Sequence, residues 1–353
     1  SLYGQARIAL QTAADKAAKE RATALLRQAV KLRTAGGLSS LVNFTKAIVN
    51  DSRTEDYDAR PWDLKTPGGI IDLRTRPHSK EAKATKMTAV SAAQTYHPGA
   101  AGYAEWESFI RHITAGDADF ARYLQTLAGM AAVGAVYEEG LVISQGPGGN
   151  GKSTFFGALR KVLGDYARSI NADVLVATGG RTDQSYVAAL RGARLVVMGE
   201  TEEGAKFGVA QMKRLTSRDT ISARALYKDP IEFEPTHTTI MHTNHLPTLK
   251  SLDGGTRRRI AVAPFPATLP PERVITNYEA LLVERCGPVI LRWIVEGARM
   301  FYNADCKLQK PDVVLQATNR YLEGEDWMKA FLDECCDVGS GYAVTAGQLR
   351  EKY

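Results

Sequence analysis

The segment GPGGNGKST, from Gly146 to Thr154, constrains the fold of this 353-residue chain more than any other feature. The apolar run 141–144 precedes it and predicts a buried strand, and residues 155–163 behind it predict a helix. A strand, a glycine-rich loop and a helix in this order surround a phosphate chain with backbone N–H groups. The helix N-terminus adds partial positive charge at the same place. The sequence therefore predicts an α/β fold with a site for a nucleoside triphosphate.

The predicted nucleotide-binding residues are those of the loop itself. Lys152 is placed to reach the outer phosphates, and the Ser153 hydroxyl to ligate Mg²⁺. ATP and Mg²⁺ are accordingly the expected cofactors. The alternative is a glycine-rich turn before an ordinary helix. The full set is Gly146, Pro147, Gly148, Gly149, Asn150, Gly151, Lys152, Ser153 and Thr154.

Composition narrows the class of protein. The net charge is +6, and residues 205–260 hold ten Lys or Arg against five Asp or Glu. A basic excess gathered beside the predicted nucleotide site favours a polyanionic partner such as nucleic acid. The four cysteines have no metal-type spacing, and no apolar run is long enough to span a bilayer. We expect reduced thiols, a cytoplasmic protein of a bacterium or a virus-infected cell, and no membrane partner.

The pattern of residues along the chain predicts three parts. Residues 1–135 are expected to form a mainly helical domain, 136–270 an α/β ATPase core, and 271–353 a helical region. The expected strands are 70–73, 141–144, 174–176, 195–198 and 238–242. The expected helices are 5–32, 38–49, 103–113, 117–133, 207–215, 277–304 with an interruption at Gly287-Pro288, and 311–335.

Polar residues follow two of the predicted strands. Glu200, Glu202 and Glu203 come directly after 195–198, which we expect to lie next to the strand of the glycine-rich loop. Carboxylates at such a strand end suit a Mg²⁺ site and a base that activates water, although a solvated acidic turn is the alternative. Asn244 follows 238–242 and is suited to hydrogen-bond an attacking water and the γ-phosphate. The pair of His242 and His245 at this strand end does not predict a metal site.

Two further segments are basic. Residues 221–235 contain two alternating runs around an Asp-Pro turn and predict a β-hairpin with Lys228 at its tip. Arg257, Arg258 and Arg259 are consecutive, so they cannot all face one site. One of them could act as an arginine finger on the nucleotide of a neighbouring subunit. An ordinary surface hairpin and a solvated basic turn are the respective alternatives.

Taken together, these motifs resemble the superfamily 3 helicases, in particular the helicase part of phage, plasmid and poxvirus primase–helicases. The resemblance extends through GPGGNGKST, the strand before Glu200, the segment KRLTSRDTISARALYKDPIEFEPTH, TTIMHTNHLP and GGTRRRIAVAPF. The upstream segment ARPWDLKTPGGIIDLRT is similar to the part that precedes the ATPase in that family. The resemblance implies an AAA+ core, a hexameric ring, and ATP bound between subunits.

The resemblance also implies roles for individual residues. The catalytic set becomes Lys152, Glu200, Glu202, Asn244 and Arg259, with Ser153 and Glu200 at the metal. The hairpin becomes a pore hairpin on single-stranded DNA, with Arg224, Tyr227 and Lys228 as contacts. The expected partners are single-stranded DNA, replication forks, other copies of the chain, and a primase outside it. The C-terminal region would begin a winged helix.

The chain departs from the family pattern in two places. Thr201 separates Glu200 from Glu202, so the metal ligand and the base stay unassigned among Glu200, Glu202 and Glu203. Arg258 is a rival to Arg259 for the finger. Three other functions stay open: a small-molecule kinase, an initiator whose ATPase only switches assembly, and a packaging or transposition motor that acts on duplex DNA without strand separation.

Overall fold

The computed structural model describes most of the chain in two compact units, Ser1–Tyr57 and Asp58–Tyr353. The described residues are 8–11, 15–32, 34, 36–41, 45, 60–75, 92–97, 99, 101–176, 184–200, 204, 206–224, 229–249, 252–269, 275–326, 331–332, 334–337, 339–345, 347–348 and 350. The predicted boundaries after 135 and after 270 both fall inside the second unit, where buried residues from all three predicted parts share one core. The three-part division stays a prediction.

The described part of the first unit is helical. Helix α2 spans Lys16–Leu32 and buries Ala22 and Ala29. The Asp15 carboxylate accepts a hydrogen bond from the Ala18 N–H at 2.7 Å and so caps the helix start. The predicted helix 5–32 is confirmed over α2. The predicted helix 38–49 is helical at 38–41, and residues 46–49 lie outside the described residues.

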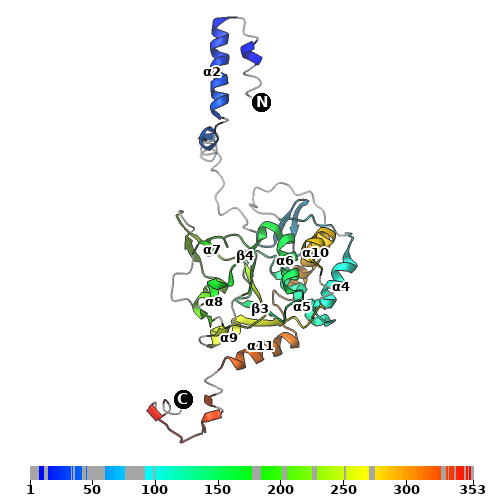
Figure 1. Cartoon of the computed structure of the whole chain (residues 1–353), viewed down its shortest axis with the longest axis vertical. Coiled ribbons are helices and arrows are strands. Elements are labelled where there is room, and N and C mark those ends of the chain that lie inside the picture. Colours follow the sequence, from blue (N-terminus) through cyan, green and yellow to red (C-terminus); the bar gives the residue numbers. More distant parts are fainter. Residues whose placement is uncertain are drawn as a thin grey trace. The chain divides into compact units, whose positions relative to one another are not determined.

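A five-stranded parallel sheet forms the centre of the second unit (Figure 1). Its strand order is β11-β3-β9-β5-β4, so β3 lies between β11 and β9. The parallel sheet confirms the α/β class. The predicted position of the 195–198 strand is wrong, because β9 separates it from the strand of the glycine-rich loop. The strands are β3 (Leu141–Gln145), β4 (Ala167–Ile170), β5 (Leu195–Met198), β9 (Thr238–Thr243) and β11 (Ile260–Pro264).

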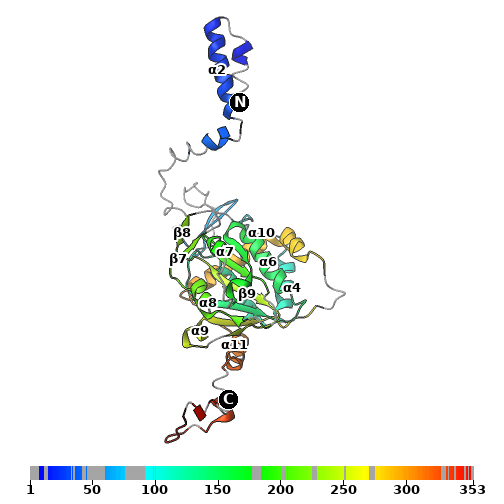
Figure 2. The same ribbon diagram turned by 60° about the vertical axis from the view of Figure 1, so that its left-hand side comes forward.

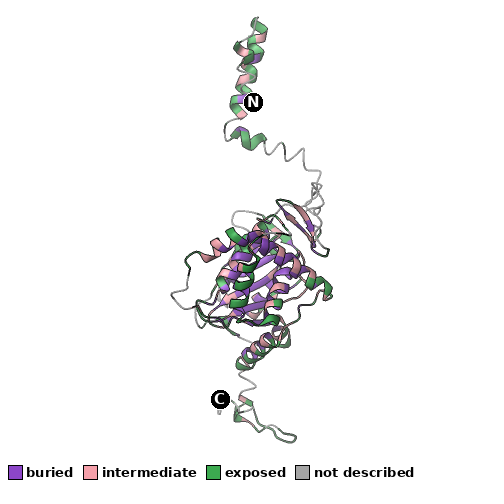
Figure 3. Ribbon diagram, turned by 90° about the vertical axis from the view of Figure 1, so that its right-hand side faces the viewer, coloured by how far each residue is buried: buried purple, intermediate pink, exposed green. Residues whose placement is uncertain are grey.

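Both faces of this sheet are covered by helices. Alternate strand residues point to opposite faces, so Val142 packs into one buried cluster while Leu141 and Ile143 pack into the other. Figure 3 shows the buried strands between helices whose inner faces are buried. The first cluster includes α4 (Tyr103–Ile113), α5 (Ala118–Met130), α6 (Lys152–Leu163) and α10 (Tyr278–Asn303). The second includes α7 (Gln184–Ala188) and α8 (Val209–Thr216). Helix α9 (Gly254–Arg259) directly precedes β11, and α11 (Asp312–Gly324) contacts β11, where the Thr318 hydroxyl accepts a hydrogen bond from the Val262 N–H at 2.9 Å.

Local signals predicted α4 and α5 well. The bounds of α4 agree with the prediction, and Asp117 caps α5 by accepting hydrogen bonds from Asp119 N at 3.0 Å and Phe120 N at 2.9 Å. Helix α5 packs closely on α10: a Cβ added to Gly129 would lie 2.0 Å from the Ala298 nitrogen. Glycine is therefore required at this crossing for the two backbones to approach.

Three other expectations need correction. Helix α10 continues through Pro288, because its residues on both sides are buried against α5 and α6 and this packing outweighs the missing N–H. Residues 174–176 are not a sheet strand: Ala172–Leu175 forms a 3-10 turn, and the strand is the half-exposed segment β4 before it. Helix α11 ends at Gly324, and residues 327–330 of the predicted helix 311–335 lie outside the described residues.

Among the described residues, the second unit also contains three short two-stranded sheets. Strands β1 (Asp63–Thr66) and β2 (Gly69–Asp72) are antiparallel, and β6 (Lys206–Phe207) pairs parallel with β10 (Thr248–Leu249). Figure 2 shows β7 (Ile221–Arg224) beside β8 (Pro230–Phe233). Ile221 faces Phe233 in this antiparallel pair, so the predicted hairpin is confirmed. Its tip, 225–228, lies outside the described residues.

Candidate nucleotide-binding site

The loop between β3 and α6 has the backbone that the sequence predicts. Gly149 and Gly151 adopt positive φ angles of 73° and 83°, which L side chains rarely adopt. A Cβ on Gly151 would also lie 2.6 Å from the Ile113 Cγ2 atom at the end of α4. Pro147, Gly148 and Gly149 are exposed, so the loop presents its backbone to solvent in front of the α6 N-terminus.

The Asn150 side chain stabilises the loop through two hydrogen bonds. It is buried, its Nδ2 donates to the Phe265 carbonyl at 3.3 Å, and its Oδ1 accepts from the Lys152 N–H at 3.3 Å. Gly146 must be glycine here, because an added Cβ would lie 2.4 Å from the backbone carbonyl oxygen of Phe265. The segment after β11 therefore helps to shape the loop, a role that the sequence did not reveal.

Lys152 is the best-defined group of the site. Its side chain is only 2% exposed, and Nζ donates to the carbonyls of Gly146 at 2.5 Å and Pro147 at 3.3 Å and to the Asn244 Oδ1 at 3.1 Å. Burial lowers the pKa of Lys152 to about 8, and the nearby Glu200 charge opposes that shift. The ammonium is thus held by neutral acceptors that a phosphate oxygen can replace.

Asn244 joins Lys152 from another strand. It follows β9, which pairs directly with β3, and the carboxyl ends of parallel strands meet at one edge of the sheet. Two residues before Asn244, the His242 ring stacks on Phe156 with a centroid distance of 6.3 Å. Burial lowers the pKa of His242, with Lys152 contributing to the shift and Glu200 opposing it, so the imidazole is neutral at pH 7.

Glu200 lies at the same edge, two strands away from β3. It is exposed after the end of β5, and its charge acts on both Lys152 and His242. Glu202 and Glu203 lie outside the described residues. The exposed Ser153 hydroxyl in the first turn of α6 and the Glu200 carboxylate are oxygen donors of the kind that Mg²⁺ prefers. Among the described residues there is no group of three or more His, Cys, Asp or Glu that could hold a metal ion alone.

The three arginines lie at the opposite edge. They end α9 directly before β11, whose first residue Ile260 is paired with Leu141, the first residue of β3. Arg259 forms an ion pair with Glu139 at 2.5 Å, Arg257 pairs with Asp326, and Arg258 is exposed. The structure therefore does not bring Arg258 or Arg259 to the Lys152 site of the same subunit.

The predicted DNA contacts are only partly described. Arg224 is exposed at the last position of β7. Tyr227 and Lys228 lie outside the described residues. In the part of the chain that the structure describes, no helix combines the length and apolar character of a membrane span.

Two protein families match parts of this chain. Residues 3–115 match the family described as "D5 N terminal like", and residues 144–259 match a family of unknown function, DUF5906. The second match begins in β3 and ends at Arg259, so it includes the glycine-rich loop, the hairpin and the three arginines.

Two viral proteins are similar in sequence. "Putative helicase L207/L206" of Acanthamoeba polyphaga mimivirus is 36% identical over 153 residues, which are 42% of this chain and 16% of that protein. "Putative helicase 022R" of Frog virus 3 (isolate Goorha) is 24% identical over 230 residues, 60% of this chain and 24% of that protein. The aligned segments thus span a quarter or less of these relatives.

The fold has a solved counterpart. The apo structure of the NrS-1 C-terminal region superimposes with a TM-score of 0.52 at 14% identity, and the match covers 89% of this chain and 75% of that one. At this identity the likeness concerns the fold alone.

Proposed function

We propose that this chain is the motor part of an ATP-dependent DNA helicase of superfamily 3, with an AAA+ core. The observation that carries the proposal is the contact of Lys152 with Asn244, which joins the glycine-rich loop to the next strand at the carboxyl edge of the sheet. The similarity to two viral proteins named as putative helicases supports the choice among nucleotide-dependent activities.

In this proposal ATP lies on the loop 146–154. Loop N–H groups and the α6 N-terminus hold the phosphates, and Lys152 exchanges its carbonyl partners for phosphate oxygens. Ser153 and Glu200 would hold Mg²⁺, and the ion would supply positive charge for the phosphates. Asn244 orients the attacking water, and Glu200, Glu202 or Glu203 accepts its proton.

Hydrolysis would need two copies of the chain. The segment 257–259 lies at the sheet edge opposite the loop, so an arginine from it can serve only a nucleotide bound to another subunit. The family resemblance favours Arg259, with Arg258 as its rival. This arrangement supports a closed ring, and a hexamer is the state expected of the family.

The hairpin of β7 and β8 would couple hydrolysis to movement on DNA. Arg224 is the last residue of β7, and Tyr227 and Lys228 follow it in the sequence before β8 begins. Contacts of such basic and aromatic residues are made mainly to phosphates and bases in a sequence-tolerant way. A change of hairpin position with nucleotide state would draw single-stranded DNA through the ring and separate a replication fork. A primase would act from outside this chain.

An ATP-switched initiator is the main alternative, and a duplex-packaging motor is another. Both would use the same nucleotide site and the same basic segment without separating strands. The alternative of a small-molecule kinase does not account for the basic hairpin.

The ATPase rate tests the proposal. We would measure it with and without single-stranded DNA, at low and moderate salt, over a range of protein concentrations. The proposal predicts a rate per subunit that rises cooperatively with concentration and is stimulated by single strands, with the stimulation lost as salt rises. A rate that depends on neither concentration nor DNA contradicts it and indicates a monomeric P-loop enzyme.

A further inference from the structure

Two residues of α11 lie where they can control the geometry of the nucleotide site from a distance. We propose that Tyr321 and Glu325 are positioning residues for Asn244. Both bind the segment that follows Asn244 in the chain, and this segment fixes the side-chain amide that contacts Lys152. The inference rests on the proposed function, because the position of Asn244 matters only if ATP is hydrolysed on the glycine-rich loop.

Asn244 lies in a turn directly after the end of β9, so the ladder of the sheet no longer holds its backbone. Its carbonyl accepts from the Gln145 Nε2 at 3.4 Å, which is longer than a usual hydrogen bond, and its Oδ1 accepts from the Lys152 Nζ at 3.1 Å. The Thr243 hydroxyl donates to the His245 carbonyl at 2.8 Å and accepts from the His245 N–H at 3.3 Å. The turn is therefore closed on itself, and its orientation depends on the segment that continues from it.

That segment is anchored by α11. The buried Tyr321 hydroxyl donates to the Pro247 carbonyl, and the Glu325 Oε2 accepts from the Leu249 N–H at 2.5 Å. Burial and the nearby Glu325 charge raise the pKa of Tyr321 above its usual value, so the hydroxyl keeps its proton and can donate. Both backbone partners belong to buried residues. Two hydrogen bonds from one end of one helix thus fix the chain just beyond Asn244.

Helix α11 has a fixed place because it covers the edge strand β11. The Thr318 hydroxyl accepts from the Val262 N–H of this strand at 2.9 Å and donates to the Val314 carbonyl of its own helix at 2.6 Å. Since β11 ends the order of the sheet, this contact occupies an edge N–H that has no neighbouring strand.

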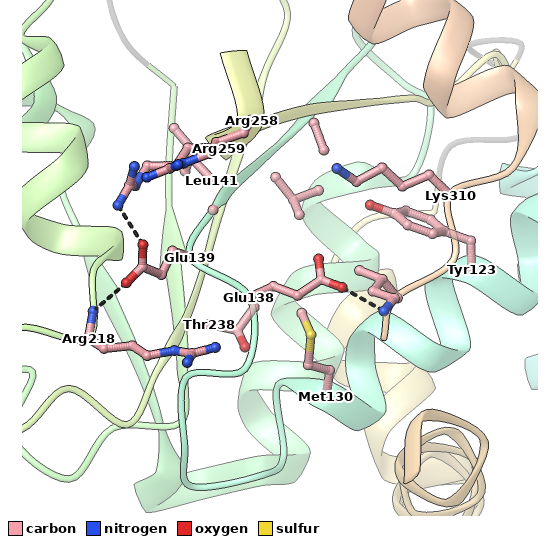
Figure 4. A pocket seen from close by; sticks show the side chains of 14 residues that line it. Tyr123, Met130, Glu138, Glu139, Leu141, Arg218, Thr238, Arg258, Arg259 and Lys310 are labelled. Atoms are coloured by element: carbon pink, nitrogen blue, oxygen red, sulfur yellow. Dashed lines mark hydrogen bonds and ion pairs between the residues drawn. The ribbon is translucent and has the colours of Figure 1, made fainter. Parts of the chain in front are cut away.

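Helix α9 anchors the end of α11 as well. Arg257 in α9 forms an ion pair with Asp326, directly after Glu325. Two residues later, Arg259 pairs with Glu139 before the start of β3 (Figure 4). The end of α11 is therefore connected to the strand that leads into the glycine-rich loop.

Strand β11 also supports the glycine-rich loop. Directly after this strand, the Phe265 N–H donates to the Gln145 carbonyl at 2.7 Å, and the Phe265 carbonyl accepts from the Asn150 Nδ2 at 3.3 Å. Lys152 is thus placed with the help of β11, and Asn244 with the help of the helix that covers β11. This common support maintains the contact between the two side chains.

The precision of this arrangement affects catalysis more than folding. A displacement of about 1 Å in a group that orients a reactant can lower a rate about 10²-fold. The loss of one hydrogen bond shifts the melting temperature of a protein by only about 2–4 °C. A positioning role therefore predicts a large loss of kcat with a small loss of stability.

Variants of the full chain test the assignment through ATP hydrolysis with single-stranded DNA. Tyr321→Phe/Glu325→Met removes both hydrogen bonds and nearly keeps the side-chain volumes. We expect a kcat at least roughly tenfold lower, a KM for ATP within about threefold of wild type, and a melting temperature lower by a few degrees. Tyr321→Phe/Glu325→Gln returns an acceptor oxygen for the Leu249 N–H, and kcat should recover by at least about threefold.

Val314→Ala is the matched stability control. It opens a cavity under the first turn of the same helix and leaves both hydrogen bonds in place. We expect a lower melting temperature with kcat within about twofold of wild type. An equal loss of kcat in Val314→Ala and in Tyr321→Phe/Glu325→Met would show that stability alone is responsible, and the proposal would be wrong.

A double-mutant cycle tests whether α11 acts through Asn244. Asn244→Ala alone should lower kcat strongly. Adding Tyr321→Phe/Glu325→Met to it should lower kcat by less than about twofold more, because no amide is left to position. A further tenfold loss in this background would place the action of α11 elsewhere and overturn the proposal.

The same assays distinguish this inference from the proposed function. If the wild type hydrolyses ATP and Tyr321→Phe/Glu325→Met keeps more than half of the wild-type kcat, only the positioning role is refuted. If the wild type hydrolyses no ATP under any of these conditions, the proposed function fails and the positioning role fails with it.

Discussion

Lys152 provides the most quantitative test of the nucleotide site, because its protonation can be varied without changing the chain. Burial lowers its pKa from 10.5 to about 8, so the ammonium loses its proton in a pH range where the protein can be studied. About nine-tenths of the side chain is charged at pH 7, half at pH 8 and about one-tenth at pH 9. The charged form predominates below pH 8 and is lost as the pH rises through it.

The affinity of the free protein for ATP should follow this charge. From pH 7 to pH 9 we expect the dissociation constant to rise about tenfold, which corresponds to about 1.4 kcal/mol. A hydrogen bond to a charged group contributes about 1.5–3 kcal/mol, so the lysine–phosphate contact is strong enough for the full effect to be visible. At saturating ATP the bound phosphate stabilises the ammonium, and kcat should therefore hold to a higher pH than kcat/KM.

Equilibrium binding of a fluorescent ATP analogue with Mg²⁺, at constant ionic strength from pH 6.5 to 9.5, measures the effect. Lys152→Arg is the control, because a guanidinium stays charged throughout and its weaker binding should be independent of pH. A flat wild-type profile, or a parallel decline in the arginine variant, would refute the account of Lys152.

Other substitutions test the site, the core and the hairpin. Gly151→Ala should destabilise the fold by ~1–3 kcal/mol and abolish nucleotide binding, because residue 151 has a positive φ and an added Cβ would clash with α4. Gly148→Ala is the control: no atom lies within 4 Å of a Cβ added at residue 148, so this variant should keep both its stability in thermal melting and its nucleotide binding. Tyr123→Phe should leave the free energy of unfolding unchanged or raise it, because the buried Tyr123 hydroxyl has no hydrogen-bond partner in the described structure. Tyr321→Phe should lower the free energy of unfolding by about 1 kcal/mol, because the Tyr321 hydroxyl donates to the Pro247 carbonyl. Equal effects of the two substitutions in urea unfolding would contradict this contrast. Lys228→Ala should abolish fork unwinding while basal ATPase persists, and normal unwinding by this variant would remove the hairpin from the mechanism.

Local chemistry explains which parts of the fold the sequence predicts. The strands β3, β5 and β9 are short apolar runs, α5 begins at a capping aspartate, and β7 and β8 alternate around a turn. Each of these sequence signals is contained in a segment of a few consecutive residues. Strand β4 gives no such signal, because it lies at the sheet edge and carries Arg168 and Ser169. The continuity of α10 through Pro288 depends on packing against helices far away in the chain.

In the candidate site, too, the sequence predicts local features and misses contacts between distant parts of the chain. The position of the loop 146–154 between a strand and a helix depends on local signals and was predicted, but the contact of Lys152 with Asn244 depends on the sheet order that places β9 beside β3. Sheet order also corrects the expected position of Glu200, which is one strand further away. The pairing of Arg259 with Glu139 joins residues that are 120 positions apart, and no spacing in the sequence indicates it.

Strand separation on a forked DNA substrate tests the central claim most directly. We would compare the wild type with Lys152→Ala at equal concentration, with ATP and Mg²⁺, on forks that carry a single-stranded tail of either polarity. The account predicts that the wild type releases the displaced strand from one of the two forks and that Lys152→Ala releases none. Hydrolysis of ATP by the wild type on single-stranded DNA, with both forks left intact at every protein concentration, would contradict the helicase and support an ATP-switched initiator or a packaging motor.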